Sequence, residues 1–174
     1  MVAQDVYRAV LSFFCDAELS RFITAMSIVL LPKVMNPKDF TQFRPISVCN
    51  FLNKVISRIL VGRLSGILLR IISPQQSGFV KGRSISDNYL LAQELMSDMG
   101  RKCRRGNLAL KLDMAKAYDR VSWRFLIAVL RRFGFGERFI DMVWRQISNV
   151  WFSVLVNGAP FGFFKSSRWL RQED

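Results

Sequence analysis

The residues best suited to chemistry lie in Leu110–Val121, LKLDMAKAYDRV, where an apolar run ends in a carboxylate and a turn follows. A strand fixes the backbone before such a turn, so Asp113 could hold a divalent cation there. Two such ions neutralise the attacking and leaving oxygens in phosphoryl and nucleotidyl transfer. Asp113 is therefore a candidate metal ligand. A purely structural role, capping a turn, is also compatible with this position.

A second carboxylate, Asp119, follows shortly after Lys116 and Tyr118. It stands just before a predicted helix that runs through Trp123 and Leu126, where aspartate is a favoured N-cap. We therefore interpret Asp119 as a cap rather than as a second metal ligand.

The net charge of the chain limits the classes of partner that it is expected to bind. The 174 residues include 26 Lys and Arg against 13 Asp and Glu, which gives a net charge of +13. A folded domain this basic usually binds a polyanion, either nucleic acid or an anionic membrane surface. The basic stripe lacks the continuous amphipathic face with interfacial Trp that membrane-surface helices show, so a membrane partner is not expected.

The cysteines and the termini exclude other classes of protein. Cys15, Cys49 and Cys103 form no C-x-x-C pair and histidine is absent, so we expect reduced thiols and no zinc site. No basic leader with an apolar core is present, and no apolar run is long enough to cross a bilayer. The sequence therefore predicts an intracellular protein without a signal peptide or transmembrane segment.

Apolar periodicity predicts a single α+β domain. Helices are expected over Val6–Phe14, Val48–Ile71, about Ser86–Met99 with Ser86 or Asp87 as cap, Ser122–Phe133 and Glu137–Ser148. Strands are expected over Met26–Leu31 and Leu108–Leu112, and VWFSVLV and APFGFF flank Asn157-Gly158, a dipeptide that suits a type I′ hairpin. Loops are expected over Asn36–Pro45, Ser73–Arg83 and the basic run Arg101–Arg105.

The chain resembles the reverse transcriptases of plant LINE-type (non-LTR) retrotransposons. The resemblance is carried, in the family's order, by SIVLLPKVMNPKDFTQFRPISVCN, KVISRILVGRL, IISPQQSGFVKGRSISDNYLLAQEL, LKLDMAKAYDRVSWRFL and SVLVNG…SSRWLRQED. It implies a partial fingers–palm of a right-hand polymerase, in which helices pack on a small, mostly antiparallel sheet. Residues 1–105 would be fingers-like and residues 106–174 an incomplete palm.

The resemblance also implies roles for single residues. Asp113 matches the first catalytic, metal-binding aspartate, and Tyr118 the steric gate against a ribose 2′-hydroxyl. Four further residues would contact the incoming nucleotide together with Tyr118: Arg44, Lys116, Ala117 and Gln172. A guanidinium such as that of Arg44 suits triphosphate oxygens. Without the resemblance, the same residues are compatible with solvated loop positions, a core aromatic and an ordinary tail residue.

The loop Gln76–Arg83 resembles the segment that tracks template and primer, with Gln76, Lys81 and Arg83 as nucleic-acid-binding residues. The implied partners are an RNA template and a DNA primer, or their hybrid. Mg²⁺ or Mn²⁺ is the implied cofactor, and the nucleus the implied location. No protein partner is implied.

The chain departs from the family near its end. The resemblance places further carboxylates in a Tyr-x-Asp-Asp turn beyond the RGLRQGD segment, and these 174 residues contain no Asp-Asp pair. Trp169 and Glu173 also stand where that segment has glycines, which permit backbone conformations that other residues disfavour. We therefore expect an inactive polymerase fragment. The alternatives are a non-catalytic RNA- or DNA-binding module that uses the basic residues Arg58, Arg63 and Arg70, or a retroelement remnant without a selected function.

Overall fold

The computed structural model describes residues 2–102, 104, 106–114 and 120–166. These residues divide into two compact units. One comprises Met1–Ile59 with Lys116–Asp174, and the other comprises Leu60–Ala115. Each unit is described by itself, and the predicted division into a fingers-like part at 1–105 and a palm at 106–174 stays a prediction.

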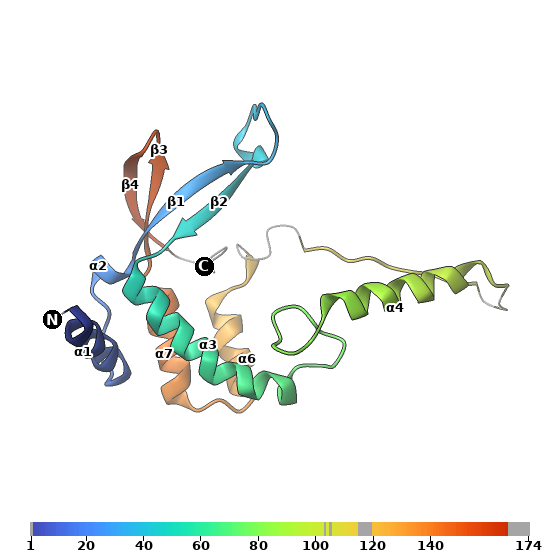
Figure 1. Cartoon of the computed structure of the whole chain (residues 1–174), viewed down its shortest axis with the longest axis horizontal. Helices are drawn as coiled ribbons and strands as arrows, with labels where there is room; N and C mark the ends of the chain where they lie inside the picture. Colours follow the sequence, from blue (N-terminus) through green and yellow to red (C-terminus); the bar gives the residue numbers. More distant parts are fainter. Residues whose placement is uncertain (1, 103, 105, 115–119, 167–174) are drawn as a thin grey trace. The chain divides into compact units, whose positions relative to one another are not determined.

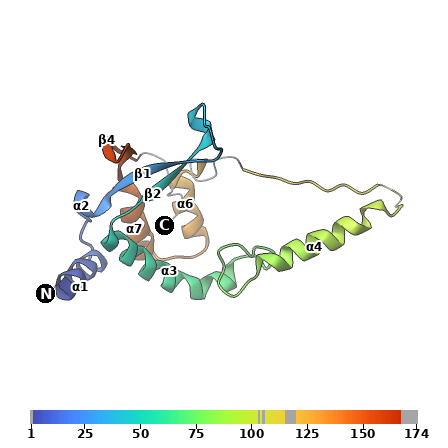
Figure 2. The ribbon, with the colours of Figure 1, turned by 45° about the horizontal axis from the view of Figure 1, so that its top comes forward.

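The first unit contains a four-stranded sheet, whose strands are blue to cyan and red in Figures 1 and 2. Its strands are β1 (Ala25–Pro32), β2 (Phe43–Val48), β3 (Trp151–Val156) and β4 (Ala159–Lys165), in the order β2-β1-β3-β4. The pairs β1–β2 and β3–β4 are antiparallel, whereas β1 and β3 are parallel. With its helices, this mixed sheet confirms the predicted α+β class.

One face of the sheet forms the core of this unit. Alternate residues of β1 point to opposite faces, so Met26 and Ile28 are buried while their neighbours are only partly covered. They pack with Cys49, Val150 and Phe152 into one cluster. The strand predicted at Met26–Leu31 is thereby confirmed.

The β3–β4 hairpin is confirmed as well. Its two-residue turn has positive φ at both central positions, 50° at Asn157 and 81° at Gly158. Positive φ at both residues defines the type I′ turn, whose twist matches that of the flanking strands.

Among the described residues of this unit, four helices accompany the sheet. They are α1 (Val2–Phe14), the short α2 (Arg21–Thr24), α6 (Trp123–Arg132) and α7 (Glu137–Ser148). Helix α3 (Phe51–Ile71) begins in this unit and ends in the other. The helices predicted at the positions of α1, α3, α6 and α7 are present. The start of α7 is as predicted, and the other three starts shift by one to four residues, as is usual for periodicity alone.

Helices α6 and α7 pack through two side-chain pairs. Trp123 meets Trp144 edge-on, with ring centroids 5.8 Å apart. Arg131 binds Glu137 through two hydrogen bonds of 2.7 and 2.8 Å, which lower the pKa of the Glu137 carboxyl. The N-cap of α6 is Ser122, which accepts a hydrogen bond from the Phe125 backbone N–H. Asp119, the cap predicted for this helix, lies outside the described residues.

The loop predicted at Asn36–Pro45 is wrong at its C-terminal end, because that part of the segment forms regular secondary structure. Asp39 caps a 3₁₀ turn, η1 (Phe40–Gln42), and β2 starts directly after it. Pro45 lies inside β2, opposite Leu30 of β1. Proline is tolerated there because β2 is an edge strand, where one side of the backbone needs no hydrogen-bond partner.

The strand predicted at Leu108–Leu112 is wrong. This segment has no regular secondary structure, and Leu108, Leu110 and Leu112 are 90%, 76% and 83% exposed. An isolated strand leaves its backbone groups unpaired, so apolar β-prone residues adopt a strand only beside a hydrogen-bonded neighbour. Among the described residues, no strand pairs with this segment.

The second unit holds the end of α3, helix α4 (Ile85–Ser97) and the 3₁₀ turn η2 (Asp98–Gly100). Ser84 caps α4 by accepting a hydrogen bond from the Ser86 backbone N–H, so neither Ser86 nor Asp87 is the cap that the sequence predicted. Among the described residues, no helix is both long and apolar enough to cross a membrane.

Candidate functional site

Arg44 lies in the edge strand β2, opposite Leu31 of β1. Its side chain is exposed and has no hydrogen-bond or ion-pair partner among the residues that the structure describes. The guanidinium is therefore available for an anion. This availability is what the predicted contact with a triphosphate requires.

A turn held by side-chain hydrogen bonds precedes Arg44. Asp39 accepts hydrogen bonds from the Thr41 backbone N–H, at 2.8 Å, and from the Thr41 hydroxyl. These hydrogen bonds, the hydroxyl first, lower the pKa of the Asp39 carboxyl. Lys33, the residue after β1, donates a hydrogen bond of 2.9 Å from its ammonium to the Thr41 carbonyl. This bond joins the end of β1 to the turn that precedes β2. The turn fixes where β2 starts and hence where Arg44 lies.

In the second unit, Arg83 organises the loop 72–83. Its Nη1 donates to the carbonyl oxygens of Ser73 and Gln76 at 2.5 and 2.6 Å, and its Nη2 to that of Ile72 at 3.1 Å. Asn88, on α4, adds a hydrogen bond of 2.8 Å to the Gln75 carbonyl. Because the Arg83 guanidinium donates these hydrogen bonds to carbonyl groups of its own loop, its geometry indicates a positioning role. Its predicted contact with phosphate stays a prediction.

The braced loop presents other side chains to solvent. Lys81 is exposed, and Phe79 is 97% exposed with a φ of 63°, a conformation that few non-glycine residues adopt. Gln76 donates through its side chain to the Gly78 carbonyl within the same turn. The sequence analysis did not single out Phe79 as an exposed loop residue. The only signal was an aromatic residue in a loop bounded by Gly78 and Gly82.

Asp113 is exposed and follows the irregular segment 108–112. Within the described ranges, no group of three or more Cys, Asp or Glu side chains could hold a metal ion. A two-metal centre needs several carboxylates around its ions. The donor set of the described residues does not fit such a centre.

The remaining predicted nucleotide contacts lie outside the described residues: Lys116, Ala117, Tyr118 and Gln172. Arg44 belongs to one compact unit, and Asp113 and the loop 72–83 belong to the other. The assembly of these residues into one site therefore stays a prediction.

Neither of two hollows formed by described residues of the first unit is lined by a predicted site residue. The larger, of about 380 Å³, lies between α6 and α7 and is lined by Arg124, Ile127 and Trp144 among others. The smaller, of about 320 Å³, adjoins Asp16, Asp141 and Arg145. The polar side chains at both hollows are largely engaged in helix packing, so we do not place the candidate site there.

Comparison with known families decides what this arrangement belongs to. The family described as reverse transcriptase (RNA-dependent DNA polymerase) matches residues 34–172, a range that includes Arg44, the loop 72–83 and Asp113. The chain belongs to the reverse transcriptase family. This family copies RNA into DNA and uses divalent metal ions.

Individual reverse transcriptase relatives come from retrotransposons. The chain is 29% identical over 94% of its length to the transposon TX1 uncharacterized 149 kDa protein of Xenopus laevis. It is 28% identical over 84% of its length to the Pol polyprotein of the type-2 retrotransposable element R2DM of Drosophila melanogaster. It spans only 13% and 14% of these two relatives, so it corresponds to a fragment of such polyproteins.

These matches confirm the predicted resemblance to reverse transcriptases of non-LTR retrotransposons. The plant origin and the inactivity that we predicted are not tested by them.

Proposed function

We propose that this chain forms part of the fingers and palm of an RNA-directed DNA polymerase and binds an RNA template with its DNA primer. The observation that carries the proposal is the family match over residues 34–172, which includes every predicted site residue. In this proposal Arg44 pairs with the triphosphate, and Gln76 and Lys81 contact the template–primer backbone.

Asp113 is the proposed Mg²⁺ or Mn²⁺ ligand and the proposed catalytic residue. Lys116, Ala117, Tyr118 and Gln172 would line the nucleotide. Trp169 and Glu173 replace glycines of the family segment. We therefore propose that the chain binds the hybrid without polymerising by itself. Nuclear localisation belongs to the same proposal.

The test is hybrid binding and primer extension by the purified, folded chain. The probe is an RNA template annealed to a fluorescent DNA primer, assayed in Mg²⁺ and in Mn²⁺. We expect binding that weakens steeply with salt, as phosphate contacts require, and no extension. Asp113→Asn is the control, because it removes the carboxylate charge and keeps the shape.

The outcomes separate the candidate functions. Extension that disappears in Asp113→Asn would contradict the proposed inactivity and establish an active polymerase. Binding of the hybrid without extension supports the proposal. Failure of the folded chain to bind hybrid or single strands would leave it without the proposed substrate and would overturn the proposal.

A further inference from the structure

The two hollows of the first unit follow each other along α7. Both are lined by Asp141 and Trp144; the larger reaches back to Glu137 and the smaller forward to Ser148. A helix rises about 16 Å over that span, which corresponds to roughly three turns. We call the combined depression the α7 groove. It is long enough for a short helix to lie in it.

Apolar side chains line the larger hollow. Ile127 of α6 and Ile140 of α7 both face it, and Ile140 is only 3% exposed. Trp144 is 41% exposed, and its ring meets that of Trp123 edge-on, which fixes its position. A tryptophan that is held by a neighbour and open to solvent offers a partner a large contact area at little cost in side-chain entropy. Tryptophan is accordingly enriched among the residues that dominate binding at protein interfaces.

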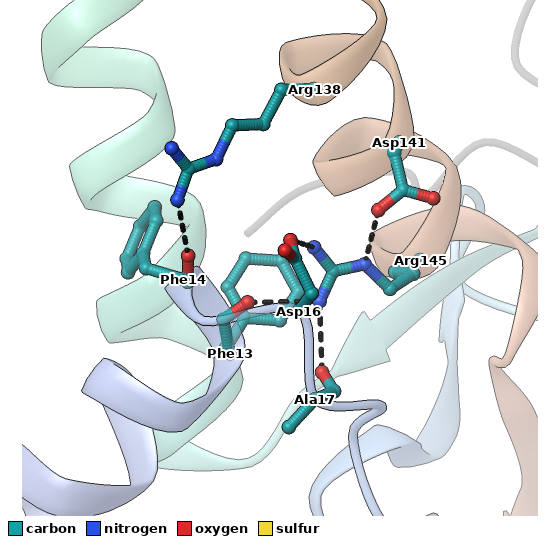
Figure 3. Close-up of polar contacts among 7 residues, drawn as sticks. All are labelled: Phe13, Phe14, Asp16, Ala17, Arg138, Asp141 and Arg145. Atoms are coloured by element: carbon teal, nitrogen blue, oxygen red, sulfur yellow. Dashed lines mark hydrogen bonds and ion pairs between the residues drawn. The ribbon is translucent and has the colours of Figure 1, made fainter.

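The smaller hollow has walls that hydrogen bonds hold in place. Arg145 lies between Asp16 and Asp141, with nitrogen–oxygen distances of 3.4 and 2.7 Å, as Figure 3 shows. Asn149 donates a hydrogen bond of 3.0 Å to the Leu19 carbonyl. These contacts join the segment between α1 and α2 to α7. The hollow is thus formed without a partner, which spares a partner the cost of ordering it.

Acidic residues gather at the smaller hollow although the chain has a net charge of +13. Its described lining contains Asp16, Glu18 and Asp141 against one cation, Arg145. The Arg145 side chain is 10% exposed, whereas those of Asp16 and Asp141 are 68% and 52% exposed. Glu18 has no hydrogen-bond or ion-pair partner among the described residues. The charge presented to solvent is therefore negative, which repels phosphate groups and attracts a cation.

The larger hollow differs in charge. Arg131 and Glu137 bind each other through two hydrogen bonds, so this pair contributes no net charge. Arg124 lines the same hollow and has no carboxylate partner among the described residues. A cationic side chain is therefore favoured in the smaller hollow, and an apolar side chain in the larger one. This difference gives a bound segment one orientation along α7.

We propose that the α7 groove binds a short basic, amphipathic helix of a protein partner. An apolar side chain of this helix packs against Ile127 and Trp144 in the larger hollow. A lysine or arginine enters the smaller hollow, where it pairs with Glu18 and lies over the exposed indole of Trp144. Amphipathic helices commonly place their apolar face in such grooves, and tryptophan is the aromatic ring that attracts cations most strongly. This surface adds a protein partner and does not depend on the proposed binding of nucleic acid.

The test measures binding of a synthetic helix by the full chain. The probe is a fluorescein-labelled peptide of about 12 residues, or three helical turns, with leucines on one face and lysines on the other. Fluorescence anisotropy measures its affinity for Glu18→Lys and for the matched control Asp5→Lys. Asp5 is also an exposed acidic residue of the first unit but lines neither hollow, and the two variants change the net charge equally. Trp144→Met is a second variant, which keeps an apolar side chain and removes the ring.

We expect Glu18→Lys to weaken peptide binding by about 2- to 30-fold, because an exposed ion pair is replaced by a like-charge contact. Trp144→Met should weaken it by about 2- to 5-fold, the range for one exposed cation–π contact. Asp5→Lys should bind like the unmodified chain, since salt screens charges that are farther apart than the Debye length. Methyl NMR should show peptide-induced shifts at Ile127 and Ile140, and the RNA–DNA hybrid should not displace the peptide.

Equal weakening by Glu18→Lys and Asp5→Lys would reduce the effect to net charge and overturn the inference. Methyl shifts confined to isoleucines outside the groove, or displacement of the peptide by the hybrid, would also overturn it. Self-association of the unmodified chain in sedimentation velocity that Glu18→Lys abolishes would assign the groove to a second copy instead. Failure of the chain to bind the hybrid would refute the proposed function and leave this inference standing.

Discussion

Arg145 donates a hydrogen bond of 2.8 Å from Nη1 to the carbonyl oxygen of Phe13, and its guanidinium lies 4.6 Å from the centroid of the Phe13 ring (Figure 3). The same guanidinium binds the Ala17 carbonyl at 2.8 Å and the Asp141 carboxylate at 2.7 Å. Since Arg145 is on α7 and Phe13 lies in the last turn of α1, one buried side chain joins two helices that are distant in sequence.

We predict that Arg145→Met destabilises the chain by about 2–4 kcal/mol. Methionine keeps the apolar stem but leaves two carbonyl groups without their donor and removes the partner of Asp141. Urea unfolding followed by circular dichroism measures the loss. Arg138→Met is the control: Arg138 makes one hydrogen bond of 3.1 Å, to the exposed end of α1 at Phe14, and its removal should cost less than about 1 kcal/mol. Equal losses in the two variants would contradict the assignment.

We predict that Thr41→Val raises the pKa of Asp39 toward its ordinary value. The variant removes the hydroxyl hydrogen bond, which is the largest cause of the lowered pKa, and keeps the backbone one. Because the folded pKa is below the unfolded one, this carboxyl stabilises the fold above its unfolded pKa, and the contribution is lost as the pH falls through the folded pKa.

Carbon-13 NMR titration of the carboxyl groups measures this shift. Glu137 serves as the internal control, because its pKa is lowered by Arg131, which the substitution does not touch. An Asp39 titration that is identical in the two proteins would show that the Thr41 hydroxyl does not hold the turn.

We predict different effects for the two cations of the loop 72–83. Arg83→Met should speed amide hydrogen exchange across the loop by at least tenfold, because three carbonyl groups lose their common donor. Lys81→Met should leave exchange unchanged and instead reduce the salt slope of hybrid binding by about one. Protected exchange in Arg83→Met would disprove the positioning role of Arg83.

We predict opposite effects of alanine at two glycines. Gly158→Ala should destabilise the chain by about 1–2 kcal/mol, because φ at this turn position is 81°. Gly66→Ala should stabilise it by about 0.5–1 kcal/mol, because Gly66 lies inside α3 with no atom within 4 Å of an added Cβ. Thermal unfolding monitored by circular dichroism distinguishes the two signs, and a shared sign would be incompatible with these backbone assignments.

The sequence predicted the elements whose signals are local. The β3–β4 hairpin follows from Asn157-Gly158, and α6 and α7 follow from their periodicity and the glycines between them. The strand β2 was missed because Pro45 and Asp39 indicate a loop, and only pairing with β1 makes the segment a strand. The strand prediction at Leu108–Leu112 was wrong for the converse reason, since a β-prone segment needs a partner strand that its own residues do not specify.

The same limit applies to the candidate site. Sequence and resemblance identified Arg44 and Lys81, and the structure describes both as exposed cations. They could not show that the Arg83 guanidinium donates hydrogen bonds to the carbonyl groups of Ser73, Gln76 and Ile72, because such contacts depend on the path of the loop.

The parallel pairing of β1 with β3 also sets an order for folding. Ala25 pairs with Trp151 across roughly 125 intervening residues, and closing so long a segment costs conformational entropy before any contact offsets it. The β1–β2 pair closes a short turn and can form early, as the ribosome releases it. Its inner edge then stays without a neighbour until β3 has been synthesised. A nascent chain that pauses in this interval exposes an open strand edge, the feature through which unfinished β proteins aggregate.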